Sequence, residues 1–369
     1  MSLVVWAVDP QRVKRGQLEV VDCMAFVYDA DVGTFQVTAT MDDLTARVGE
    51  GWRVIVQDGE QTVLSGPIDS LEPDLAEHTV TLVGVSDLAL VHDHLVYPNP
   101  AQAAGSQGDA YFKRTGPAAE VIDYLVHKNA GSGALTDRRV PGLAMAVGQG
   151  GLLGSTVTAN IRFKNLLEES RALARLGGVT FDAKQEGEYI RFRFRVPVDR
   201  SRSVRFTAGN GGVTDGQYAL AAPTATTVIV AGQGEGAART IIERSRASTW
   251  GRRIEVFKDQ RDTDDAAQLE QSATESLDEG AAGASASFTV AETPGLRFGT
   301  DFQLGDTVTV EVGALTISEP VRAVELTWDG HGRTASLTLG DHDQADDKTP
   351  AWVKKIKDLD ARLRGMEVR

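Results

Sequence analysis

Two stretches of this chain share one pattern: residues 51–87, GWRVIVQDGEQTVLSGPIDSLEPDLAEHTVTLVGVSD, and residues 305–341, GDTVTVEVGALTISEPVRAVELTWDGHGRTASLTLGD. Each begins with glycine and an alternating strand, continues with a short strand into a proline, and closes with another strand. Alternation with a period of two is typical of half-buried β-strands. Because the copies have equal length, we predict two related small β-barrels or sandwiches, one near each end of the chain. The alternative is that two unrelated antiparallel meanders share the pattern.

The composition indicates an acidic protein with several compact units. The chain has 369 residues, of which 41% are hydrophobic, and a formal net charge of −14. Acidic chains are not typical nucleic-acid binders. The single cysteine, Cys23, excludes an internal disulfide and a cysteine-ligated zinc site. No apolar run is long enough to cross a bilayer or to form a signal peptide, so we expect synthesis and folding in the cytoplasm.

Changes in composition predict four segments. A β-rich segment spans residues 1–98, and an inserted α+β region follows at 99–230. A second β-rich segment spans 231–341 and contains an acidic helix at 263–279. A charged linker and an amphipathic helix fill residues 342–369. The expected fold class is therefore β-rich α+β, with two β-barrel or sandwich domains on either side of the inserted region.

Three glycines, Gly232, Gly234 and Gly236, follow a β-branched run in the sequence VIVAGQGEG. A strand that runs into glycines is one way to cradle a phosphate. Their spacing differs from the dinucleotide fingerprint, no Gly-Lys-Ser/Thr follows, and the next residues read as another strand. We therefore predict a glycine-rich hairpin or a loop that faces an oligomer or partner.

Three arginines, Arg191, Arg193 and Arg195, alternate with apolar residues along the expected strand 189–196. Alternation places the arginines on one face of the strand and the apolar side chains on the other. This basic stripe is a candidate for contact with phosphate or with a partner. Because the aromatic side chains that would stack on bases point away from the arginines, we favour a solvated face or a subunit contact.

The sequence contains no recognisable catalytic motif. It has neither a G-x-S-x-G elbow nor an H-E-x-x-H pair. His92 and His94 share one side of an expected strand, but the spacing supplies no third metal ligand, which favours structural or surface roles. Cys23 has apolar flanks and is expected to be a buried, inert thiol. We predict no enzymatic activity, cofactor or metal, although a glycosidase-type carboxylate pair stays open.

The last segment carries a seam of apolar residues. Trp352, Ile356, Leu359, Leu363 and Met366 are spaced by 4, 3, 4 and 3 residues, as in the a/d seam of a coiled coil. About two and a half heptads are too few for a stable free coiled coil. Either this helix closes an oligomer that is held together elsewhere, or it docks on its own chain.

Three further stretches carry a family resemblance: TVTLVGVSDLALVHDHLVYP at 79–98, VIVAGQGEGAARTIIERSR at 228–246 and FGTDFQLGDTVTV at 298–310. Together with the doubled stretch, they resemble the Gp37-like tail proteins of long-tailed phages that infect actinobacteria, which are tail hub, baseplate or minor tail proteins. Segment 166–194 is similar to hub proteins more generally. The resemblance spans nearly the whole chain, and its motifs are structural.

The resemblance implies a homotrimer at the virion tail tip, assembled in the host cytoplasm. Two tube-like domains in each subunit would give three chains a pseudo-sixfold ring. The implied neighbours are the distal tail protein, the tail tube or tape-measure protein, and receptor-binding or fibre proteins. DNA would pass through the ring without specific binding, and acidic walls would prevent it from sticking. We therefore expect acidic groups to outnumber basic ones on the inner face.

Two other classes of function stay open. One is an enzyme that degrades cell-wall glycan, which the release of soluble fragments from host cell walls would reveal. The other is a carbohydrate-binding tail adhesin, which a monomeric mass combined with sugar binding would favour.

Overall fold

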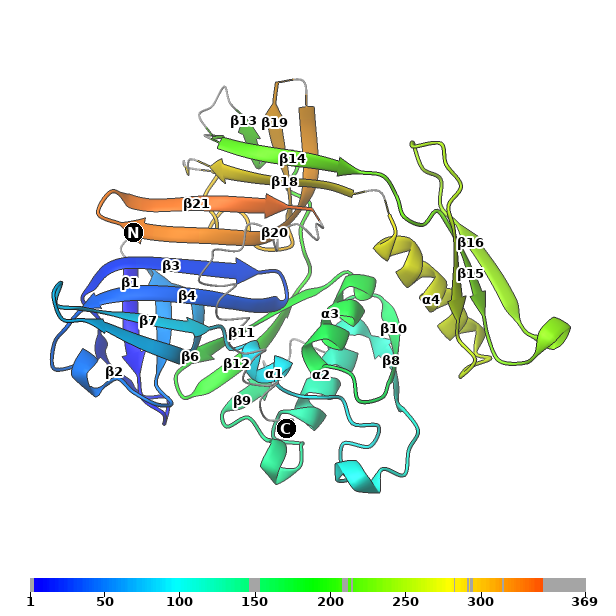
Figure 1. The fold of residues 1–369 in the computed structure, drawn as a ribbon, viewed down its shortest axis with the longest axis horizontal. Helices are drawn as coiled ribbons and strands as arrows, with labels where there is room; N and C mark the ends of the chain where they lie inside the picture. The colour runs from blue at the N-terminus through cyan, green and yellow to red at the C-terminus, as the bar shows by residue number, and fades with distance from the viewer. Residues whose placement is uncertain are drawn as a thin grey trace.

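The computed structural model of this protein describes residues 3–340, apart from 146–152, 208–211, 214, 282, 291, 293–294 and 314. Strands dominate this part of the chain, and the few helices gather in two places (Figure 1). The expected β-rich class is therefore confirmed. None of the helices in the described ranges is long and apolar enough to cross a membrane.

The first part of the chain is β-structure, apart from turns and a short 3-10 helix at Thr45–Arg47. Its strands are β1 (Leu3–Val8), β2 (Lys14–Gln17), β3 (Val20–Tyr28), β4 (Asp31–Thr40), β5 (Arg53–Asp58), β6 (Gln61–Asp74) and β7 (Thr79–Val85). The middle part mixes helices and strands. Its elements are α1 (Ala89–His92), β8 (Phe112–Pro117), α2 (Ala118–Asn129), β9 (Leu143–Met145), β10 (Thr156–Ile161), α3 (Leu166–Gly177), β11 (Thr180–Glu186) and β12 (Tyr189–Arg195).

The last part returns to β-structure around one helix. Its elements are β13 (Arg205–Thr207), β14 (Asp215–Ala221), β15 (Thr227–Ala231), β16 (Ile241–Ser245), β17 (Glu255–Asp259), α4 (Ala266–Glu279), β18 (Gly283–Val290), β19 (Thr307–Val312), β20 (Leu315–Asp329) and β21 (Gly332–Leu339). The helix predicted at 263–279 is α4, which confirms that prediction.

The doubled stretch folds into two matching three-strand units, β5–β6–β7 and β19–β20–β21. Arg53 pairs with Pro67 in the first unit, and Thr307 pairs with Pro320 in the second. The register of the long strand then shifts immediately after each proline, at Ile68 in β6 and at Val321 in β20. The repeat seen in the sequence is thus a repeat in strand pairing.

In the larger sheet, β6 and β7 continue into β4 and β3, and β20 and β21 continue into β18 and β14. The two resulting four-strand units lie edge to edge in one sheet. The order of these eight strands is β14-β18-β21-β20 followed by β3-β4-β7-β6, which Figure 1 shows stacked from top to bottom. The first halves of β6 and β20 leave this sheet and form a second layer, with β5, β1 and β2 in one unit and with β19 and β13 in the other. The result is a pair of sandwich-like layers.

A single apolar core fills the space between the layers and runs through both units. Phe35, Val37 and Leu82 of the eight-stranded sheet are fully buried in it, together with Phe206 and Val310 of the second unit. Each fully buried apolar side chain of this size contributes about 1.5–3 kcal/mol. Because both units share the core, they form one rigid body.

The inserted region has its own core, in which α2 and α3 pack together above two small sheets, β10-β8 and β11-β12-β9. The side chain of Asn165 caps α3 by accepting the N–H groups of Leu167 and Glu168. Gly178 ends the helix with a φ of 68°, a conformation that glycine adopts without strain.

A third, smaller unit projects from the body and consists of α4 packed on the sheet β16-β15-β17 (Figure 1). Two glutamines of α4 contact the inserted region: Gln268 accepts from the Asn160 amide at 3.4 Å, and Gln271 bonds to Thr158. The Gln271 amide donates to the Thr158 carbonyl and accepts the Thr158 N–H, both at 3.0 Å. This side chain therefore takes the place of a neighbouring strand along β10.

Strand pairing groups the elements across the expected domain boundaries. β13 and β14 lie within residues 99–230, but they pair with β19 and β18 of the second β-rich segment. Pairings of this kind join residues far apart in sequence. The division of the chain into domains stays a prediction.

Candidate functional site

One face of the eight-stranded sheet has no second layer and carries short polar side chains. The strand register places a band of hydroxyls on this face, formed by Thr38, Thr40, Thr79, Thr81, Thr327, Thr334, Ser336 and Thr338. The hydroxyls of Thr38 and Thr81 lie 3.3 Å apart across β4 and β7. Cross-strand threonine pairs of this kind stabilise a sheet without an apolar cover. We call this surface the open face.

The charged groups on the open face are acidic. Asp22 lies on β3, Glu72 and Asp74 lie on β6, and Glu325 and Asp329 lie on β20. Apart from Arg322, at the register shift of β20, the described strand positions of this face hold no lysine or arginine. Burial raises the pKa of the Glu325 carboxyl. A surface with this charge repels phosphate groups.

The junction between the two four-strand units is formed by β20 and β3 and held by ion pairs. Asp29 pairs with Arg322 at 2.6 Å, and its N–H donates to the Arg322 carbonyl at 2.9 Å. On the opposite side of the sheet, Asp58 accepts from Arg297 at 2.8 Å. Arg333 lies between Asp58 and Glu292 and pairs with both. Apart from the Arg333–Glu292 pair, these contacts link residues that are more than 200 positions apart in the chain.

Within this charge cluster, burial changes the pKa values of both kinds of group. Burial raises the pKa of Glu292, and the guanidinium of Arg333 lowers it in turn. Burial lowers the pKa of Arg333, against the effect of the neighbouring carboxylates. The charges therefore depend on one another, and removal of any one would leave a poorly solvated partner.

The eight-stranded sheet ends in two edges that pair on one side only. At one end, β14 pairs with β18 and with no other described strand. At the other end, residues 70–74 of β6 pair with β7 alone. Glu72, Pro73 and Asp74 are exposed. Edges with unpaired backbone groups are ready-made positions for another strand.

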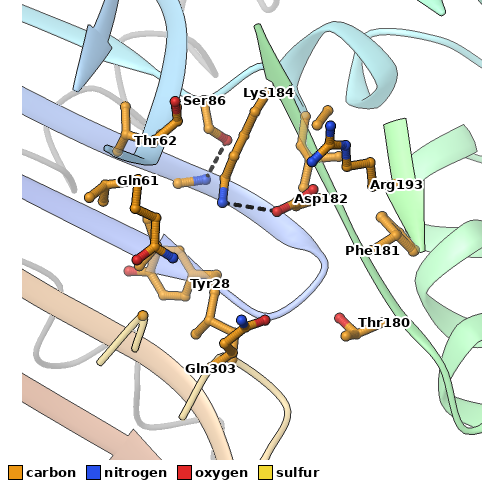
Figure 2. Close-up of a pocket in the computed structure, with 18 of the residues that line it drawn as sticks. Tyr28, Gln61, Thr62, Ser86, Thr180, Phe181, Asp182, Lys184, Arg193 and Gln303 are labelled. Carbon is orange, nitrogen blue, oxygen red and sulfur yellow. Dashed lines mark hydrogen bonds and ion pairs between the residues drawn. The ribbon is translucent and has the colours of Figure 1, made fainter. Parts of the chain in front are cut away.

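A cavity of about 720 Å³ lies where the first β-unit, the inserted region and the loop with Phe298 and Gln303 of the second β-unit meet (Figure 2). Gln61 and Thr62 line one wall, and residues 180–184 of β11 line the other. In the wall formed by β11, Lys184 pairs with Asp182 at 2.9 Å. No group of three potential metal ligands occurs among the described residues. The cavity thus offers no convergent catalytic set.

The predicted arginine stripe lies on β12, opposite the buried aromatic residues of the same strand. Arg195 donates to Asp306 at 2.5 Å, Arg193 pairs with Glu186, and the Arg191 guanidinium lies 4.6 Å from the centre of the Tyr189 ring. Each arginine therefore has a partner in its own chain. A role for the stripe in contacts with another subunit stays a prediction.

The glycine run joins β15 to β16, which pair as antiparallel strands. Gly234 and Gly236 have φ values of 114° and 54°, and the Gly232 N–H donates to the Thr240 carbonyl at 2.9 Å. This is the hairpin that the sequence predicted. Its proposed contact with a partner stays a prediction, and the seam from Trp352 to Met366 lies outside the described residues.

The expected strand at His92 is wrong, because residues 89–92 form the helical turn α1. Both ring nitrogens of His94 lie 2.9 Å from main-chain carbonyl oxygens, those of Leu90 and Arg138. His94 is thus a structural histidine. Cys23 is fully buried on β3, and burial raises the pKa of its thiol, which confirms the expected inert cysteine.

A buried polar network at the end of the first repeat was not predicted from the sequence. Asp87 is fully buried, pairs with Arg53 and accepts the Ser65 hydroxyl at 2.6 Å. Arg53 also donates to Gln185 of β11 at 3.2 Å. Burial raises the pKa of Asp87, and Arg53 opposes this effect. The network joins the first β-unit to the inserted region.

The comparisons with known proteins agree on one class. The family model described as Siphovirus ReqiPepy6 Gp37-like protein matches residues 5–341. The 43 kDa tail protein of prophage MuSo2 from Shewanella oneidensis is similar in structure, with a TM-score of 0.60, 14% identity, and 92% of this chain and 98% of that chain covered.

Two other tail proteins have the same fold. Prophage tail protein gp18 from Listeria monocytogenes EGD-e gives a TM-score of 0.57 at 11% identity, covering 96% of this chain and 98% of that one. The tail protein from Neisseria meningitidis MC58 gives 0.56 at 12%, covering 93% and 98%. No curated protein sequence matches the chain.

Proposed function

Because the chain belongs to the family of Siphovirus ReqiPepy6 Gp37-like tail proteins, we propose that it is the hub of a phage tail tip, where three copies form a pseudo-sixfold ring. Membership makes the chain a structural component of a phage tail or baseplate. The trimer, its place at the tail tip and its assembly in the host cytoplasm are parts of the proposal.

The observation that carries the proposal is the doubled four-strand unit. Two units with the same strand order and the same register shift lie side by side in one sheet. A rotation that relates one unit to the next can continue through further copies of the chain, and closed rotational symmetry is the usual outcome of such contacts. With two units per chain, three chains supply the six units that match a sixfold tail tube.

The two faces of the sheet support an orientation of the chain in the proposed ring. One face is covered by the second layer and the shared core, so we propose that the open face lines the channel. The open face is rich in hydroxyls and carries acidic groups. DNA phosphates would be repelled there, which lets DNA pass without specific binding.

The remaining parts of the chain supply contacts with other tail proteins. In Figure 1 the inserted region lies below the eight-stranded sheet, and the projecting unit of α4 and β15–β17 lies to its right. We propose that they contact the distal tail protein, the tail tube or tape-measure protein, and receptor-binding or fibre proteins. We assign no catalytic step to the chain.

Light scattering across a range of protein concentrations tests the oligomeric state. We expect the mass to rise towards three times the 39.5 kDa of one chain. Counting copies in purified tails by quantitative mass spectrometry provides the second measurement. A monomer at every concentration, combined with a copy number in tails that is not three, would overturn the proposal.

A further inference from the structure

We propose that neighbouring copies join through residues 70–75, the end of β6 and the first residue after it, in one copy and residues 216–221 of β14 in the next. The two strands would run antiparallel, in the register that β20 and β3 hold inside a single chain. This inference rests on the proposed ring and names the surface through which it closes. It follows from the position of each strand in the doubled unit.

The first step is to match the strands at one end of each unit. After the register shift, Ser70 of β6 lies opposite Val83 of β7, and Ala323 of β20 lies opposite Thr338 of β21. Equivalent residues are therefore 253 apart in β6 and β20 (323 − 70) and 255 apart in β7 and β21 (338 − 83).

The second step extends the match to the other end of each unit. Val37 of β4 and Phe288 of β18 face equivalent residues of β7 and β21, so these strands are offset by 251 (288 − 37). Cys23 of β3 faces Val37, and Gly216 of β14 faces Phe288. Equivalent residues of β3 and β14 are thus 193 apart (216 − 23).

With these offsets, the residue pairs at the junction inside the chain predict the residue pairs between neighbouring chains. Inside the chain, Glu325 pairs with Phe26. Subtraction of 253 from the first number and addition of 193 to the second give Glu72 of one copy opposite Ala219 of the next. The same rule pairs residues 70–75 with residues 221–216, and both strands are edges of the described sheet.

This seam between chains lacks the ion pair that holds the junction inside the chain. The residue equivalent to Arg322 is Asp69, and the residue equivalent to Asp29 is Ala222. Pro73 also removes one backbone donor, as is common on edge strands. The ring therefore alternates between firm junctions within chains and weaker seams between them, and it separates at the seams into intact chains.

Disulfide cross-linking tests this register. Glu72→Cys with Ala219→Cys places two thiols on residues expected to lie directly opposite each other, about 4.5–5.5 Å apart at Cα, within disulfide range. These positions lie at opposite ends of the sheet of one chain, so a bond between them joins two chains. The control is Glu72→Cys with Asp215→Cys, which moves one thiol four residues, about 13 Å, along the strand.

After oxidation, we expect the first variant to shift from the monomer band to three times its mass in a non-reducing gel, and the control to stay at the monomer. Both must first show the parent's far-ultraviolet circular dichroism and light-scattering mass under reducing conditions. A trimer by light scattering with no cross-link, or with the cross-link in the control, overturns this register and leaves the ring intact. A monomer at every concentration, combined with a copy number in tails that is not three, removes the ring itself.

Discussion

Replacement of Asp87 by alanine should destabilise the protein strongly. Its side chain is fully buried, and its partner Arg53 is only 8% exposed. The substitution leaves the Arg53 cation with Gln185 as its remaining side-chain partner, and the Ser65 hydroxyl loses its acceptor. Removing one member of a buried ion pair costs about 3–5 kcal/mol, so we expect the free energy of unfolding to fall by that amount.

Two further variants distinguish the loss of the buried ion pair from a general loss of packing. The double variant Arg53→Met with Asp87→Leu buries no charge and should recover about 2 kcal/mol relative to Asp87→Ala, because apolar replacement of both partners is often neutral. Arg253→Ala removes one member of an exposed pair and should leave stability unchanged. Urea unfolding followed by tryptophan fluorescence measures all three. Equal losses for Asp87→Ala and Arg253→Ala, or no recovery in the double variant, would refute the reasoning.

Three further predictions follow from particular positions. Gly66→Ala places a Cβ 1.8 Å from a main-chain oxygen of β7 and should cost more than about 3 kcal/mol, while Gly49→Ala, with open space, should change stability by less than about 0.5 kcal/mol; urea unfolding compares the two. Burial raises the pKa of Glu325, so folding favours the protonated carboxyl. The contribution of this residue to stability is therefore fully present below the unfolded pKa of about 4.3 and is lost as pH rises through the folded pKa. Glu325→Gln should therefore raise the melting temperature at pH 7 relative to the parent but not at pH 4, and equal gains at both would contradict this. Gln271→Ala removes two hydrogen bonds to β10, so hydrogen exchange should become faster in β10 but not in β4, which serves as the internal control.

The repeat was predictable because its signals are local. Alternation identifies each strand, and a proline at the same place in both copies, Pro67 and Pro320, fixes where the long strand leaves its first partner. The hairpin at Gly232–Gly236 and helix α4 were predictable for the same reason. Turn glycines and helical spacing both determine the structure of residues that are only a few positions apart in the chain.

Pairings between distant segments were not predictable from these signals. β14 joins β18 across the whole projecting unit, and Arg53 reaches Gln185 across 132 positions. Nothing in the local sequence marks such partners. The error at His92 has another cause, since a short β-branched and apolar run such as Leu88–Val91 fits a helical turn as well as a strand. The open face was visible in the sequence only as alternating threonines, without the neighbours that make it a surface.

The most direct test of the central claim is an electron cryomicroscopy reconstruction of the assembled tail tip. The account predicts six four-strand units around one axis, contributed by three chains, with Thr38, Thr81 and Glu325 facing the channel. It would be contradicted by a different number of units, or by an open face that is buried against another protein on the outside of the ring.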